Sequence, residues 1–128
     1  MLITGLVLAA LAGVIHVYIF VLESVRWTQP ATRRIFGVRS AEDAETMRSL
    51  AFNQGFYNLF LALTVFLGVV LAIVGQTTVG ATLVLAATGM MLAAALVLVL
   101  SDRTKLRAAS VQGVLPLLAV IVVGMGIA

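Results

Sequence analysis

The chain lacks cysteine, has only two prolines and one histidine, and carries charge on only 10% of its 128 residues. The lack of cysteine excludes a disulfide scaffold, and one histidine with scattered carboxylates does not make a metal-ligand set. Soluble domains have about 25% charged residues, because polar side chains must cover their surface. The scarcity of charge therefore excludes a water-soluble domain and an intrinsically disordered chain.

What the chain does have is apolar sequence, since hydrophobic residues make up 62% of it. A helix that crosses a membrane needs about 20 mostly apolar residues. Four stretches meet this requirement and leave no room for a second domain. We therefore expect an all-α integral membrane four-helix bundle that forms one transmembrane domain over residues 1–128. The expected helices cover about residues 2–22, 41–74, 79–100 and 108–128.

The positions of the cations predict the orientation. All eight lysines and arginines lie in or beside the first and third loops: Arg26, Arg33, Arg34, Arg39, Arg48, Arg103, Lys105 and Arg107. The positive-inside rule places these loops in the cytoplasm and both termini outside. The N-terminal stretch lacks the basic residues that open a signal peptide, so we expect the first span to be retained. The positive charge of these loops is explained by the orientation of the chain in the membrane. The expected partner is therefore the lipid bilayer and not a nucleic acid.

The long first cytoplasmic loop contains signals for local structure. Pro30 fits the first turn of a helix and Gly37 fits a helix stop, which predicts one amphipathic turn on the membrane surface. Ser40 is placed to cap a helix whose first residue is Ala41, so the second membrane helix should begin in water. Trp27 is expected in the aromatic belt at the membrane interface.

Polar residues within the spans indicate which faces look inward. His16 and Glu23 are seven residues apart and share a helix face within about 20°. Four further polar residues cover one arc of about 140° on the second helix. All lie in the cytoplasmic half, which predicts a polar pocket that opens to the cytoplasm. The candidate ligand-binding residues are His16, Glu23, Asn53, Gln54, Tyr57, Asn58 and Gln112, with Arg48 at the rim.

Several of these residues have two interpretations. His16 is either a neutral ring that joins two helices or a proton carrier, because ionisable groups inside membranes are often functional. Glu23 is either an interfacial carboxylate paired with an arginine or a pocket carboxylate that binds a cation or a proton. Arg48 is either a topogenic charge or an anion-binding residue. The amides of Asn53, Gln54 and Asn58 favour a binding surface, because buried amides need hydrogen-bond partners.

Three segments resemble a known family. They are Ile15–Glu23, the stretch Ala51–Ala62 with its sequence Phe-Asn-Gln-Gly-Phe-Tyr-Asn, and Leu106-Arg107-Ala108 followed by Gln112-Gly113. These resemble the small four-span bacterial proteins catalogued as domain of unknown function 1304. The resemblance covers essentially the whole chain. It implies a multi-pass protein of the bacterial inner membrane and supplies no activity.

A weaker resemblance is to the membrane-associated proteins of eicosanoid and glutathione metabolism. Arg48 and Asn53 have the spacing of the arginine–asparagine signature that opens the second helix of that family. The acidic residue that follows the asparagine there is absent here, where positions 56 and 57 are Phe and Tyr. This resemblance implies a trimer that binds glutathione near the cytosolic face.

Three functions of different classes remain open at this point. The first is a carrier or exporter that loads a small amphiphilic molecule, with Glu23 and His16 as its ionisable groups. The second is an enzyme on a lipophilic substrate, glutathione-transferase-like, with Tyr57 or His16 as acid or base. The third is a structural subunit whose polar run docks another protein's helix. We also expect a homo-oligomer, because the stripes of small residues suit more than one interface.

Overall fold

The structure is a computed structural model that describes the whole chain, residues 1–128, and it is helical nearly throughout. It contains five α-helices, one π-helical turn and one 3-10 turn, with no strands. In chain order the elements are α1 (Leu2–Phe20), the π-helical turn Val21–Val25, α2 (Pro30–Phe36), α3 (Ala41–Ile73), α4 (Thr77–Ser101), the 3-10 turn Arg103–Lys105 and α5 (Leu106–Ile127).

Four of these helices, α1, α3, α4 and α5, are long and apolar enough to cross a membrane. This finding confirms the expected all-α fold. The 33 residues of α3 span about 50 Å at a rise of about 1.5 Å each, whereas the hydrocarbon core of a bilayer is about 30 Å thick. One end of α3 therefore extends beyond the hydrocarbon. We assign this to the end near Ala41, because Glu42 and Asp43 lie in its first turn.

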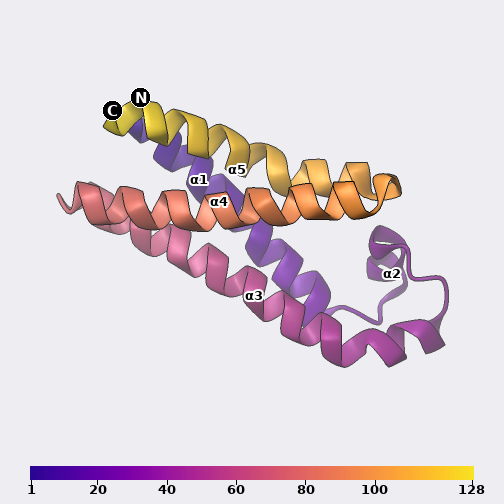
Figure 1. The fold of residues 1–128 in the computed structure, drawn as a ribbon. Coiled ribbons are helices and arrows are strands. Elements are labelled where there is room, and N and C mark those ends of the chain that lie inside the picture. The colour runs from indigo at the N-terminus through magenta and orange to yellow at the C-terminus, as the bar shows by residue number, and fades with distance from the viewer.

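The four long helices form a ring in which each packs against two neighbours (Figure 1). Helix α1 packs against α3 and α5, and α4 packs against the same two helices, so α1 and α4 lie diagonally opposite. Both termini lie at one end of the bundle, and α2 lies at the other. Toward the α2 end, α3 diverges from α4 and α5, so the bundle is open on that side.

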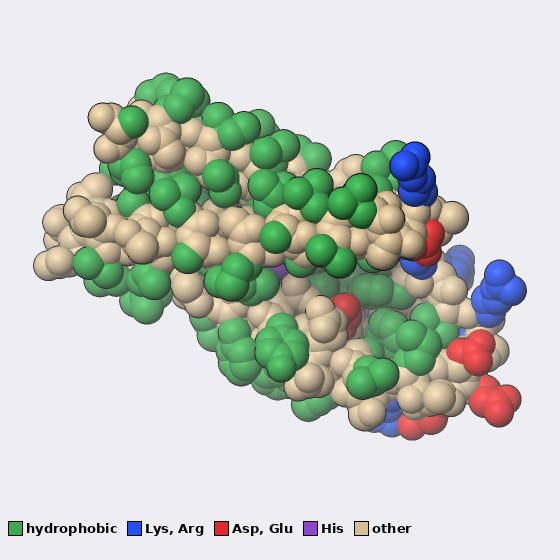
Figure 2. Space-filling model, in the orientation of Figure 1, with side chains coloured by type: hydrophobic (Ala, Val, Ile, Leu, Met, Phe, Trp, Pro, Cys, Tyr) green, Lys and Arg blue, Asp and Glu red, His purple; other side chains and the backbone are tan.

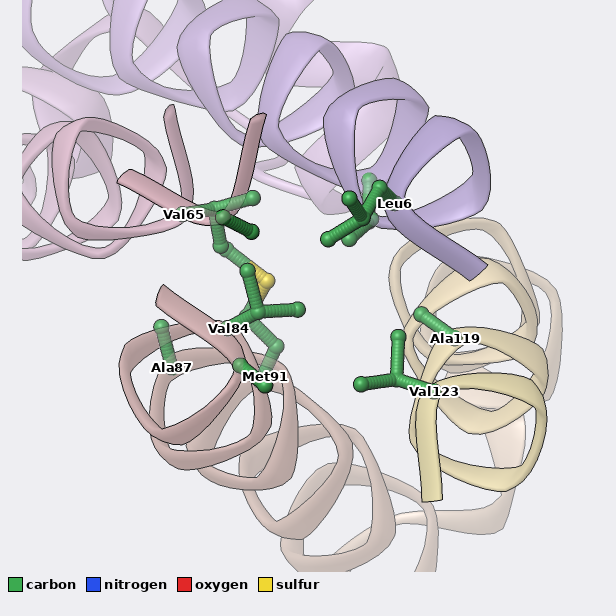
Figure 3. Close-up of a cluster of buried hydrophobic side chains, with 11 residues drawn as sticks. Leu6, Val65, Val84, Ala87, Met91, Ala119 and Val123 are labelled. Atoms are coloured by element: carbon green, nitrogen blue, oxygen red, sulfur yellow. The ribbon is translucent and has the colours of Figure 1, made fainter. Parts of the chain in front are cut away.

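Small residues let the helices approach closely at the end that holds the termini. A Cβ atom on Gly68 of α3 would lie 2.8 Å from the Gly80 carbonyl oxygen of α4, and one on Gly5 of α1 would lie 2.6 Å from Val123 of α5. Around these contacts lies the main apolar core, to which every long helix contributes (Figure 3). Its largest members are Leu6, Val65, Val84, Met91 and Val123.

The first loop folds as its sequence predicts. Helix α2 begins at Pro30 and ends at Phe36, and it is followed by the C-cap residue Gly37, which adopts a left-handed conformation with φ of 70°. Glycine suits this position because it has no Cβ atom to clash there. The hydroxyl oxygen of Ser40 accepts a hydrogen bond from the Asp43 backbone N–H at 3.0 Å and so caps α3. Both predicted helix signals in the loop are therefore confirmed.

Trp27 differs from its expected place in an interfacial belt. Its ring is buried, and the indole N–H donates to the Ala44 carbonyl at 2.8 Å. The ring centroid lies 5.2 Å from that of Phe36 in α2. The ammonium group of Lys105, from the third loop, donates to the Phe36 carbonyl at 3.1 Å. Trp27 therefore holds the first loop against α3, and the first and third loops are in contact.

Candidate functional site

The candidate site begins where α1 ends. The Arg26 backbone N–H donates to the Val21 carbonyl at 2.9 Å, a bond across five residues that defines a π-helical turn. Glu23 lies inside this turn, and its residue is only 9% exposed. Single π-helical turns are rare and are frequent at functional sites. The π turn therefore places a buried carboxyl group at the end of α1.

Asn58 of α3 binds this carboxyl group. Its side-chain amide donates one hydrogen bond to Glu23 Oε2 at 2.8 Å and a second to the Gln54 carbonyl at 3.2 Å. Asn58 is also 9% exposed. The first bond joins two helices and the second fixes the amide to its own helix. Both amide hydrogens are thus in use, and the Glu23 carboxyl is held against α3.

Gly55 allows α1 and α3 to come this close. A Cβ atom at this position would lie 3.0 Å from the Ser24 backbone nitrogen and 3.1 Å from Glu23 Cβ. The Ser24 hydroxyl donates to the Phe52 carbonyl at 2.7 Å, which adds a second bond between the same two segments. The site is therefore built on a tight backbone contact that only glycine permits.

His16 lies deeper on the same face of α1 and is 2% exposed. Its Nδ1 lies 2.9 Å from the Ala12 carbonyl oxygen. A carbonyl oxygen only accepts, so Nδ1 carries the hydrogen and Nε2 of the neutral ring carries a lone pair. Seven residues of helix separate His16 from Glu23, which corresponds to about 10 Å along the axis.

Three polar atoms of these side chains have no partner within the protein. They are Glu23 Oε1, Asn58 Oδ1 and His16 Nε2. The only buried side-chain nitrogen or oxygen atom without a partner is Arg33 Nε, so each of the three remains accessible to a water-sized molecule. Figure 2 shows a hollow between α4 and α3 in which histidine and acidic side-chain atoms are visible. With Glu23 ionised and His16 neutral, all three free atoms are hydrogen-bond acceptors.

No cationic side chain neutralises Glu23. The only ion pair of the chain joins Arg48 to Glu45 at 3.3 Å, between side chains that are 64% and 63% exposed. An ion pair between Glu23 and an arginine, one of the two interpretations of this residue, is therefore not observed. Buried carboxylates in proteins are ordinarily paired or hydrogen-bonded, because desolvation of an isolated charge is costly. Glu23 has one hydrogen bond and no counter-charge.

The other expected inward residues do not join this site. Asn53, Gln54 and Tyr57 are exposed, and Gln112 is half-buried and makes no side-chain hydrogen bond. Asn53 lies about 140° and Tyr57 about 100° around α3 from Asn58, so the packing against α1 turns both outward. Gln54 is only about 40° away from Asn58 around the helix, but its side chain is exposed as well. The expectation of one inward arc is thus corrected to Asn58 alone.

The arginine–asparagine pair of the weaker resemblance is also separated. Arg48 binds Glu45 on the exposed surface of α3. Asn53 lies about 140° further around the helix and is exposed as well. The two side chains therefore point in different directions and form no common anion site.

The turn between α4 and α5 contains one acidic residue, Asp102. The Asp102 carboxylate accepts hydrogen bonds from the Thr104 hydroxyl at 2.6 Å and from the Thr104 backbone N–H at 2.9 Å. These two bonds, the hydroxyl first, hold the pKa of Asp102 below its ordinary value. Asp102 thus has a local role in the turn. The chain has no group of three or more His, Asp or Glu side chains that could hold a metal ion.

The sequence analysis did not identify three parts of the site. Ser24 is an ordinary hydroxyl beside a stronger candidate, and its bond to Phe52 becomes evident only when α1 and α3 are placed together. Gly55 stands in the middle of the amide-rich run, and a small residue there could have indicated a close helix contact. The π turn over Val21–Val25 has no recognisable sequence signal.

Comparison with known proteins gives one positive result. The profile of the family described as "Protein of unknown function (DUF1304)" matches residues 10–124, a range that includes His16, Glu23, Gly55 and Asn58. No curated protein and no solved structure matches the chain. The match covers most of the sequence and confirms the resemblance carried by the segments around His16 and Asn58. The chain therefore belongs to the DUF1304 family.

Proposed function

We propose that this protein binds a small amphiphilic molecule at the site formed by Glu23, Asn58 and His16. The observation that carries the proposal is the set of three accessible acceptor atoms on otherwise buried side chains. A contact with only a structural role would pair its polar groups within the protein, whereas these three atoms are left for a group from outside the protein. Three of the six polar side-chain atoms of the site are left for a ligand.

We further propose that the protein lies in a bacterial inner membrane with both termini outside and the site on the cytoplasmic side. The eight basic residues support this orientation, because they lie in or beside two loops at one end of the bundle. The bond from Lys105 to the Phe36 carbonyl brings those two loops together. A ligand would then reach Glu23 from the cytoplasm or from the inner leaflet.

Among the activities that such a site allows, we place transport first. The enzyme alternative requires Tyr57 or His16 as acid or base, and only His16 lies in the site, because Tyr57 is exposed about 100° around α3 from Asn58. Glutathione is an anion, and it would need donors and cations where the site offers acceptors and a carboxyl group. These two observations make the glutathione-transferase-like alternative the weaker one. A partner subunit would require the exposed Asn53 and Tyr57 to dock another helix.

Ligand-induced stabilisation tests the proposal. The purified protein is mixed with a panel of amphiphiles of different head groups, and its thermal unfolding is followed. A ligand at about 100 times its dissociation constant stabilises the folded state by about 2.7 kcal/mol. The response should be lost in Asn58→Ala, which removes the amide that holds Glu23.

Asn53→Ala is the matched control, because it removes the same amide from an exposed position five residues away on the same helix. It should respond to ligand as the unmodified protein does. No response to any amphiphile, or an equal loss of response in both variants, would contradict a binding site at Asn58. Such a result would favour the partner-subunit function.

A further inference from the structure

We propose that the ligand is a cationic amphiphile whose head group is a protonated amine, and that its ammonium group binds Glu23. This inference rests on the proposed function, because it assigns a chemical class to the ligand of that same site. It follows from two independent features, the missing counter-charge of Glu23 and the acceptor character of the free atoms.

The first feature is charge. Glu23 is buried in the bundle, and no lysine, arginine or histidine side chain lies within ion-pairing distance of it. The chain contains eight basic residues, of which only Arg48 forms an ion pair, and this pair is on the surface. An ammonium group at Glu23 would supply the charge that the protein itself does not provide. A ligand anion at the same place would add a second negative charge to an uncompensated carboxylate.

The second feature is hydrogen bonding. Glu23 Oε1 and Asn58 Oδ1 are free acceptors on two side chains that are already joined by a 2.8 Å bond. A primary ammonium group has three N–H donors and no acceptor, so it can donate to both of these acceptors and keep one N–H for water or for the other Glu23 oxygen. Bonds between an ammonium and a carboxylate are also stronger than neutral ones. A hydroxyl head group would donate only once, and a carboxylate head group would not donate at all.

The position of the site within the candidate membrane spans explains why the ligand should have an apolar tail. Glu23 lies two residues before the end of the first candidate span, Leu2–Val25, and Asn58 lies within the second. An amine that reaches this pair is therefore surrounded by helices whose outer surfaces are apolar, as Figure 2 shows for the face around the hollow. A ligand with a hydrocarbon tail can leave its tail in the lipid while its ammonium group is bound.

Equilibrium binding to the protein in phosphatidylcholine nanodiscs tests this inference. The probe is radiolabelled dodecylamine, and the competitors are dodecanol and dodecanoate, which share its tail. Empty nanodiscs give the partition into lipid, which is subtracted. Unlabelled dodecylamine should compete at least about tenfold better than dodecanol, which is the difference expected for a charge-assisted bond.

Glu23→Gln should lower the affinity for dodecylamine at least about tenfold, because it keeps the shape and removes the charge. Glu23→Asp keeps the charge and should retain a preference for the amine over dodecanol. Glu45→Gln removes a carboxylate from the exposed surface of α3 and should bind as the unmodified protein does. Monodisperse elution of each variant establishes that it is folded.

Two further outcomes separate the inference from the proposed function. If dodecanol or dodecanoate binds in an Asn58-dependent way and dodecylamine binds no better, the amine assignment is overturned and the binding site stands. If none of the three molecules binds the unmodified protein, the amine assignment is likewise overturned, and the amphiphile panel decides separately whether a binding site exists. Unchanged dodecylamine affinity in Glu23→Gln also overturns the assignment.

Discussion

Gly55 is the residue on which the contact between α1 and α3 depends most directly. It faces the π turn, where a Cβ atom would approach both Ser24 and Glu23 more closely than side chains ordinarily do. The two segments must move apart to accept even a methyl group. Such a movement would lengthen the bonds that Ser24 and Glu23 make to α3.

We therefore expect Gly55→Ala to destabilise the protein by about 1–3 kcal/mol, the usual effect of overpacking. Thermal unfolding of the detergent-purified protein measures the change. Gly89→Ala is the matched control, because a Cβ atom at Gly89 meets nothing within 4 Å. It should be neutral or stabilise by about 0.5–1 kcal/mol, since alanine favours the helix. Equal destabilisation by both substitutions would contradict the tight contact at Gly55.

Asn53 and Asn58 show how far single residues could be predicted from the sequence. Hydrophobic periodicity does not distinguish inside from outside in a membrane helix, because both sides are apolar. The amide-rich run identified the correct part of α3 but not its inward direction. That direction is set by Gly55, which packs against Ser24 and Glu23 in the π turn, and the burial of Asn58 follows from this contact.

At the scale of the elements, the helices themselves were predictable and their divergence was not. Each span carries enough apolar residues to be recognised, and the signals at Pro30, Gly37 and Ser40 correctly indicated α2 and the start of α3. The divergence of α3 from α4 toward the α2 end depends on how four helices share a limited core. That core lies toward the termini and leaves the α2 end open.

Helix α2 is held against the rest of the protein by contacts from the third loop and from Trp27. Lys105 holds the Phe36 carbonyl, and Phe36 packs against the buried Trp27. We expect Lys105→Ala to loosen α2 and to increase the acrylamide quenching of Trp27, the only tryptophan of the chain. The exposed side chain of Arg103 in the same turn makes no hydrogen bond, so Arg103→Ala should leave quenching unchanged. Equal quenching in the two variants would show that Lys105 does not hold the first loop.

At the scale of the whole molecule, the small-residue stripes serve the internal packing of one chain. Gly5, Gly68 and Gly113 each face another helix of the same chain, whereas Gly89 and Gly124 have no neighbour within 4 Å. A homo-oligomer, as expected from the sequence, would therefore have to use surfaces other than these three glycines. Size measurement of the protein in detergent determines the number of copies.

The orientation of the molecule gives a further prediction. The chain has no cysteine, so single cysteines can be introduced without a background. A membrane-impermeant maleimide applied to intact spheroplasts should label Gln76→Cys, in the turn between α3 and α4, and should not label Ala31→Cys in α2. Both variants should react after the cells are broken. Labelling of Ala31→Cys alone in intact spheroplasts would place the termini and the basic loops on the opposite sides.

The central claim is that the Glu23 carboxyl group is buried in the bundle, free of a protein counter-charge and accessible to a small molecule. Covalent labelling by dicyclohexylcarbodiimide tests it most directly. This apolar reagent adds the O–H of a carboxylic acid across one of its C=N bonds, and the adduct rearranges to a stable N-acylurea. Mass spectrometry of the membrane-embedded protein locates the added mass.

The account predicts an adduct on Glu23 that is absent in Glu23→Gln, that persists in Glu45→Gln, and that forms more slowly when dodecylamine occupies the site. Protection by dodecylamine would link accessibility to binding in a single measurement. No adduct on Glu23 in the unmodified protein, or an adduct that forms at the same rate with and without dodecylamine, would contradict the account.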